Sequence, residues 1–98
     1  MCAHAQELRT ASDVFAYGVL LNETLTGVRP WRRVQSAMAI GHKITKGERP
    51  EPTVVGAAGS LVDRCWHASM DARPSMPEVF EEMVRMHSRL RDLEEGGV

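Results

Sequence analysis

The 98-residue sequence carries no marked excess of charge and no long hydrophobic run. Its 12 Lys and Arg nearly balance its 13 Asp and Glu, which argues against a nucleic-acid-binding or anionic-membrane surface. The longest nearly uninterrupted apolar run, Val14 to Leu21, is far shorter than the roughly 20 residues that cross a bilayer. A basic segment followed by a hydrophobic one is also missing from the N-terminus. We therefore expect a cytoplasmic protein with no nucleic-acid and no membrane partner.

Cysteine is scarce as well. Cys2 and Cys65 are too few for a disulfide scaffold and fit a reducing compartment. Cys2 with His4 and Cys65 with His67 would in principle supply four zinc ligands. Only one residue separates the members of each pair, however, whereas known compact zinc modules leave at least two residues between paired cysteines. We interpret both cysteines as structural and expect no metal site.

What the sequence does contain is helical periodicity. Residues 1–10 show none that is sustained and are predicted to form a loop. Ser12 and Asp13 are typical of a helix N-terminus, and the apolar segment that follows ends near Thr26, before Gly27. Because apolar residues occupy nearly all faces of this first helix, we expect it to lie in the middle of the domain.

Three further helices are predicted. The second runs from Val34 to Lys46, and the third starts at Ser60 and ends before Met70. The fourth begins at the capping sequence Ser75-Met76-Pro77-Glu78 and carries one apolar stripe, formed by Val79, Met83, Met86, Leu90 and Leu93. Such a stripe is usually core, and a coiled-coil seam is the alternative. Residues 94–98 are expected to fray.

Several short motifs follow one another along the chain. They are Ser12-Asp13-Val14-Phe15-Ala16-Tyr17-Gly18-Val19-Leu20-Leu21, Leu25-Thr26-Gly27, Pro30-Trp31, Gly47-Glu48-Arg49-Pro50, Leu61-Val62-Asp63-Arg64-Cys65-Trp66 and Asp71-Ala72-Arg73-Pro74-Ser75-Met76. In this order and at these separations they resemble the large lobe of protein kinases over residues 11–84. The Cys-Trp pair followed by Arg-Pro-Ser is similar to the tyrosine kinase and tyrosine-kinase-like groups.

The resemblance implies an all-α fold of about four helices around a central apolar helix, with residues 11–93 forming the C-terminal part of a kinase domain. It also implies roles for individual residues. Asp13 would accept hydrogen bonds from the catalytic loop, although it could equally cap only its own helix. Arg73 would pair with a Glu at the end of the activation segment, a position that Glu7 loosely matches.

The resemblance further implies structural positions for Gly18, Leu20, Thr24 and Trp66. Leu20 and Thr24 match positions where the central helix of the family supports a stack of apolar side chains that leads to the adenine site. Thr24 departs from the larger apolar residue usual at its position. For both we expect a buried or half-buried position in the core.

The motifs that are missing bear most directly on function. The sequence has no glycine-rich phosphate loop, no Val-Ala-Ile-Lys-like strand, no His-Arg-Asp loop and no Asp-Phe-Gly. We therefore expect a kinase-domain fragment that is inactive alone, with no catalytic, metal or cofactor-binding residue; ATP and Mg²⁺ belong to the complete family domain. Its partner would be the remainder of that domain. The alternatives are a helical protein-interaction module and an unrelated four-helix protein.

Overall fold

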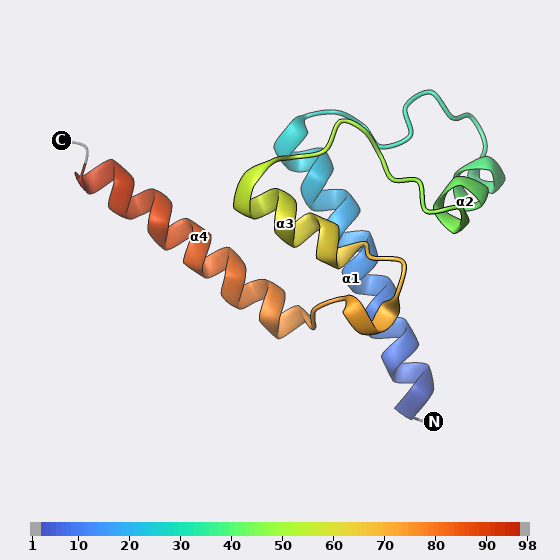
Figure 1. Ribbon diagram of the computed structural model, residues 1–98, viewed down its shortest axis with the longest axis horizontal. Coiled ribbons are helices and arrows are strands. Elements are labelled where there is room, and N and C mark those ends of the chain that lie inside the picture. The colour runs from blue at the N-terminus through green and yellow to red at the C-terminus, as the bar shows by residue number, and fades with distance from the viewer. Residues whose placement is uncertain (1–2, 97–98) are drawn as a thin grey trace.

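The computed structural model describes the backbone of residues 3–96 and the side chains of residues 10–92. The described residues form α1 (Ala3–Thr26), α2 (Ala37–Thr45), α3 (Gly56–Cys65), a short 3₁₀ turn (Met70–Ala72) and α4 (Met76–Gly96), with no strand among them. Helix α3 lies across α1, whereas α4 runs outward from α3 and α2 sits apart beside the connecting loops (Figure 1). The predicted all-α fold is confirmed.

The two ends of the chain differ from the prediction. Residues 3–10 are helical rather than a loop, because Ala, Gln, Glu, Leu and Arg are all good helix formers. Ser12 and Asp13 therefore lie inside α1 and do not cap it. Residues 94–96 continue α4, and the fraying expected for 94–98 stays a prediction. Residues 1–2 and 97–98 lie outside the described part.

The inner boundaries are closer to the prediction. Helix α2 starts three residues later than expected, at the point where the Ser36 side chain accepts a hydrogen bond from the amide of Ala39 at 3.0 Å. Helix α3 starts earlier than expected, at Gly56. Helix α4 begins as predicted, with the Ser75 hydroxyl accepting from the amide of Glu78 at 3.3 Å.

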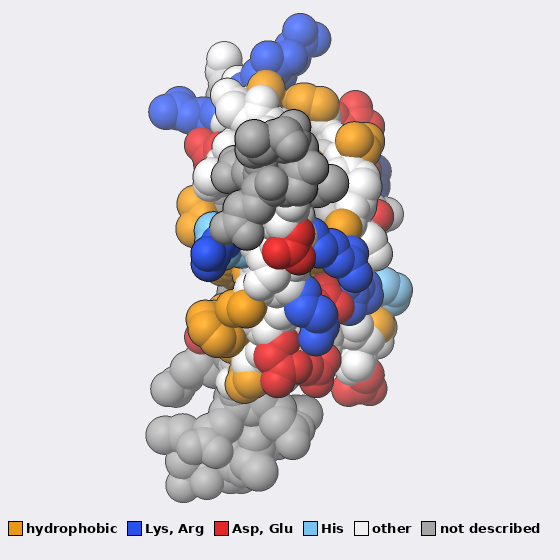
Figure 2. All heavy atoms as spheres, turned by 90° about the vertical axis from the view of Figure 1, so that its left-hand side faces the viewer, with side chains coloured by type: hydrophobic (Ala, Val, Ile, Leu, Met, Phe, Trp, Pro, Cys, Tyr) orange, Lys and Arg blue, Asp and Glu red, His pale blue; other side chains and the backbone are white. Residues whose placement is uncertain are grey.

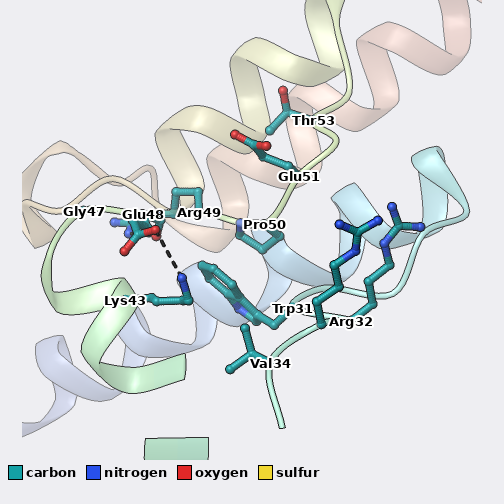
Figure 3. A pocket seen from close by; sticks show the side chains of 11 residues that line it. Trp31, Arg32, Val34, Lys43, Gly47, Glu48, Arg49, Pro50, Glu51 and Thr53 are labelled. Carbon is teal, nitrogen blue, oxygen red and sulfur yellow. Dashed lines mark hydrogen bonds and ion pairs between the residues drawn. The ribbon is translucent and has the colours of Figure 1, made fainter. Parts of the chain in front are cut away.

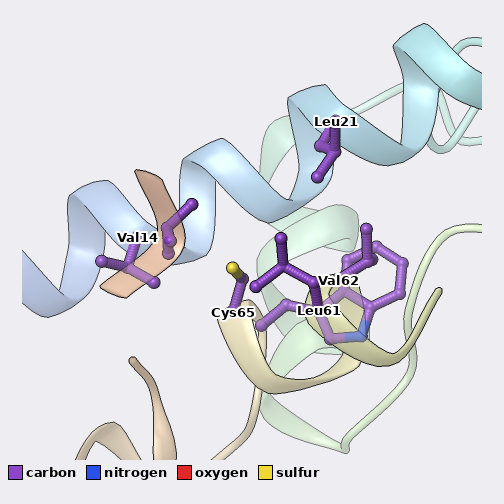
Figure 4. Close-up of a cluster of buried hydrophobic side chains, with 7 residues drawn as sticks. Val14, Leu21, Leu61, Val62 and Cys65 are labelled. Atoms are coloured by element: carbon purple, nitrogen blue, oxygen red, sulfur yellow. The ribbon is translucent and has the colours of Figure 1, made fainter. Parts of the chain in front are cut away.

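The core lies where α1 crosses α3. Its buried apolar residues are Val14, Leu21, Leu61, Val62, Cys65, Trp66 and Val79 (Figure 4). Gly18 permits this close crossing, since a Cβ there would stand 2.7 Å from the Cβ of Cys65. The opposite face of α1 is uncovered within the described residues. The radius of gyration of 15.4 Å exceeds the roughly 13 Å expected for a compact chain of this length, because the helices do not close into a globule.

One buried polar side chain fixes the loop between α2 and α3. Asn22 is 3% exposed, and its amide group donates to the carbonyl of Pro52 at 3.0 Å. Its carbonyl oxygen accepts from the amide of Val54 at 2.8 Å. The carbonyl oxygen of Val54 in turn lies so near Gly59 that a Cβ at Gly59 would stand 2.2 Å from it. Residues 52–54 are thus held between α1 and α3.

An ion pair joins α3 to α4. The Arg64 guanidinium donates to the Glu82 carboxylate. On the face of the molecule that Figure 2 shows, basic and acidic side chains lie side by side. The hydrogen bond between Arg64 and Glu82 holds the pKa of Glu82 below its usual range and raises the pKa of Arg64. Both side chains are partly exposed, at 43% and 26%, so the pair stabilises the fold by less than about 1 kcal/mol.

This pair predicts a pH-dependent contribution to stability. Because the pKa of Glu82 is lower in the folded than in the unfolded chain, the contribution is complete above an unfolded pKa of about 4.3 and is lost as the pH falls through the folded value. Glu82→Gln should therefore unfold at lower urea than the parent at pH 7, and the gap should close at acid pH. Glu81→Gln, at an exposed position on the same helix, is the control. A gap of equal size at both pH values would contradict the assignment.

Candidate functional site

Two arginines from distant segments converge on one aromatic ring of α1. The guanidinium carbons of Arg49 and Arg73 lie 5.1 and 5.0 Å from the centroid of the Phe15 ring. Cation–π contacts of this kind contribute about 0.5–1 kcal/mol at exposed sites and more when desolvated. We call Arg49, Arg73 and Phe15 the arginine clamp. It joins the segments that follow α2 and the 3₁₀ turn to the middle of α1.

Arg73 also binds main-chain oxygens. Its Nε donates to the carbonyl of His67 at 2.8 Å, and its Nη1 donates to the carbonyl of Ala11 in α1 at 3.0 Å. Burial lowers the pKa of Arg73 from its usual value. The side chain of its predicted partner, Glu7, lies outside the described side chains, so this pairing stays a prediction. Within the described residues, Arg73 serves as a link between backbone segments.

Arg49 donates hydrogen bonds to carbonyl groups at two helix C-termini. Its Nε donates to the carbonyl of Trp66, the C-cap of α3, at 2.8 Å, and its Nη1 donates to the carbonyl of Ile44 in the last turn of α2 at 3.3 Å. Terminal carbonyls lack helical partners and carry the negative end of the helix dipole, so a cation is favoured there. Desolvation, and then repulsion by Arg73, lower the pKa of Arg49. This role of Arg49 was not predicted from the sequence, although a basic residue just beyond the helix stop at Gly47 was a usable signal.

The predicted site residues fall into two groups. Gly18 and Trp66 are buried at the crossing of α1 and α3. The expectation that Leu20 and Thr24 are buried or half-buried is wrong, since Leu20 is 57% exposed and Thr24 is exposed too. Both lie on the side of α1 that faces away from α3. Asp13 shares this exposed face, and its carboxylate makes no ion pair or hydrogen bond within the described part of the chain.

The clamp and its surroundings contain little that could perform chemistry. No three His, Cys, Asp or Glu side chains among the described residues come together in a group that could hold a metal ion. Burial raises the pKa of the Cys65 thiol, which disfavours the reactive thiolate. The arrangement can hold helices and loops together.

A groove of about 590 Å³ lies beside the clamp, between the segment after α1 and the loop after α2 (Figure 3). Its lining includes Trp31, Arg32, Arg33, Lys43 and residues 47–51 and 53. Trp31 adopts a left-handed backbone conformation, with a φ of 54°. A bulky residue in this region costs about 1–3 kcal/mol, and such strain is found disproportionately at functional sites.

The family model described as protein tyrosine and serine/threonine kinase matches residues 2–83. The chain belongs to this protein kinase family. Among similar proteins is receptor-interacting serine/threonine-protein kinase 4 of Mus musculus, 30% identical over 81 residues that cover 74% of this chain and 10% of that protein. Another is receptor tyrosine-protein kinase erbB-4 of Homo sapiens, 33% identical over 88 residues that cover 87% of this chain and 7% of that protein.

Fibroblast growth factor receptor homolog 1 of Drosophila melanogaster is a third, 33% identical over 78 residues, 76% of this chain and 11% of that protein. The chain thus spans about a tenth of the length of these kinases or less. The matches confirm that it is part of a protein kinase domain, and its all-helical fold is that of the large lobe. Within the described residues, no helix combines the length and apolarity that a membrane span requires.

Proposed function

We propose that this chain is a helical support of a protein kinase domain and that alone it neither binds ATP nor transfers phosphate. The observation that carries the proposal is the open face of α1. Asp13, Leu20 and Thr24 are separated by seven and four residues, which places them on one side of a helix, and all three are exposed. The remainder of a kinase domain would cover this face, with Asp13 free to accept hydrogen bonds from its catalytic loop.

The missing sequence motifs support the same proposal. Phosphoryl transfer depends almost entirely on positioning and on stabilisation of charge, which kinases obtain from a glycine-rich loop, a lysine, a catalytic aspartate and bound magnesium. The chain has no sequence that matches the motifs for these parts. ATP and Mg²⁺ are therefore ligands of the complete domain in this proposal, and we place the chain in the cytoplasm, where ATP is present.

The test measures binding and catalysis separately. Titration calorimetry of the purified 98-residue chain with magnesium-ATP should show no binding heat, and incubation with labelled ATP and a generic protein substrate should transfer no label. A complete protein kinase domain under the same conditions is the positive control. Saturable ATP binding or transfer of label above the background of a heat-denatured sample would reject the proposal.

The groove beside the clamp favours a second candidate function, that of a protein-interaction module. It is formed by residues 31–34, by Lys43 of α2 and by residues 47–51 and 53 of the following loop, which together leave an open hollow on the surface. In this role the chain would bind a partner protein through the groove, with or without the rest of a kinase domain. A stable monomer that binds one specific partner would distinguish this function from that of a support.

A further inference from the structure

Charge is distributed unevenly along the chain despite its balanced total. The stretch 24–47 contains no Asp or Glu, and it carries five cationic side chains, those of Arg29, Arg32, Arg33, Lys43 and Lys46. The rest of the sequence therefore carries a net negative charge, since the whole chain has a formal charge of −1. A local concentration of one sign attracts ligands of the opposite sign even when the whole protein is nearly neutral.

The fold brings this basic stretch to the groove. Arg32, Arg33 and Lys43 all line it, from the segment after α1 and from α2. Lys43 is already paired with Glu48 at 3.4 Å. Arg32 and Arg33 are exposed and make no ion pair or hydrogen bond within the described part of the chain. Two forked guanidinium groups at the edge of the groove thus have no partner among the described residues.

The groove also offers apolar contacts. Trp31 is half-buried, and Figure 3 shows its ring with Lys43 and Glu48 on one side and Arg32 on the other. Val34 and Pro50 also line the groove. The volume of about 590 Å³ is within the range of ligand-binding clefts, and its openness to solvent suits an extended chain more than an enclosed small molecule.

We propose that this groove binds an acidic peptide segment of a partner protein. Carboxylates of the peptide would pair with the forks of Arg32 and Arg33, for which bidentate geometry is favourable. An apolar residue of the peptide would lie on Trp31. The inference deepens the interaction role given above as the second candidate function, and it does not depend on whether the chain has catalytic activity.

A peptide fits the groove better than a nucleic acid does. Glu48 and Glu51 line the same hollow, and Glu51 is exposed. A nucleic acid carries a phosphate at every nucleotide and would bring some of them close to these carboxylates, whereas a peptide can separate its acidic residues by neutral ones. Peptide amides can also donate hydrogen bonds to Glu51. The acidic residues of the groove thus select against a uniform polyanion.

Fluorescence anisotropy of a short labelled peptide of alternating Glu and Leu tests the inference. The chain should bind this peptide, and replacing Glu by Gln or Lys in the peptide should abolish binding. Added salt should weaken it, because ions screen exposed charges. Arg32→Gln with Arg33→Gln should weaken binding about tenfold, since two exposed ion pairs are lost. Arg85→Gln with Arg89→Gln, which removes the same charge from exposed positions on α4, should leave it unchanged.

Tryptophan emission gives a second readout on the unmodified chain. Because Trp66 is 4% exposed and Trp31 lines the groove, bound peptide should change the emission of Trp31. Equal binding of the Gln peptide, equal loss in the α4 double variant, or tighter binding of a single-stranded oligonucleotide would overturn the inference. The phosphate-transfer assay decides the support role independently, so failure of one proposal leaves the other standing.

Discussion

Replacing Gly59 by alanine should destabilise the chain more than any other single methyl addition at its described glycines. The added Cβ would stand 2.2 Å from the carbonyl oxygen of Val54 and 3.0 Å from its carbonyl carbon. These are backbone atoms, so no change of rotamer relieves the contact, and residues 52–54 must move away from α3. That movement also strains the two hydrogen bonds of Asn22. We expect a loss of about 3 kcal/mol, measured by urea unfolding followed by circular dichroism.

Gly41→Ala is the matched control for this prediction. Gly41 lies in α2 at an exposed position, and a Cβ there would meet no atom within 4 Å. Alanine should therefore stabilise α2 by up to about 1 kcal/mol through its higher helix propensity. If Gly59→Ala unfolds at the same urea concentration as Gly41→Ala, the close approach of the Val54 carbonyl to α3 does not exist in solution.

Leu61→Ala is the second substitution with a large expected effect. Leu61 is 0% exposed and belongs to the core at the crossing of α1 and α3. Truncation of a buried leucine removes its transfer free energy and leaves a cavity, which together cost about 2–5 kcal/mol. A small domain has about 5–15 kcal/mol of stability in all, so the variant should melt far below the parent or fail to fold at 37 °C. Thermal unfolding by circular dichroism measures the difference.

Leu90→Ala controls for the loss of three carbon atoms outside the core. Leu90 lies on α4 and is 61% exposed, so its replacement should change the free energy of unfolding by less than about 0.5 kcal/mol. Equal destabilisation by the two substitutions would mean that α4 packs against another part of the chain or against a second molecule, and that Leu61 does not lie in the main core.

Local signals along the sequence were sufficient for several elements of this fold. Gly27 ends α1 with a φ of 74°, and its amide bonds to the carbonyl of Glu23 at 2.8 Å, as expected for a glycine stop. Ser75 marks the start of α4 for an equally local reason, because its hydroxyl accepts from an amide three residues ahead. Such features depend only on residues within one helical turn, so they can be predicted from a single sequence.

The candidate site was harder to predict because it depends on contacts between distant residues. Asn22 bonds to residues 30 and 32 positions away, and Arg73 bonds to a carbonyl 62 positions away. A local sequence pattern does not predict which distant carbonyl group a side chain will bind. The exposure of Leu20 was missed for a related reason, since an apolar residue on an apolar helix is buried only where another element covers it.

The buried thiol of Cys65 makes the α1–α3 crossing open to a chemical measurement. Its side chain is 0% exposed and faces Gly18, so an alkylating reagent reaches the sulfur only when the two helices part. The labelling rate of Cys65, in a chain whose Cys2 is replaced by Ser, thus counts these openings directly. A partner that binds α1 and makes these openings rarer would lower the labelling rate of Cys65 without contacting its sulfur atom.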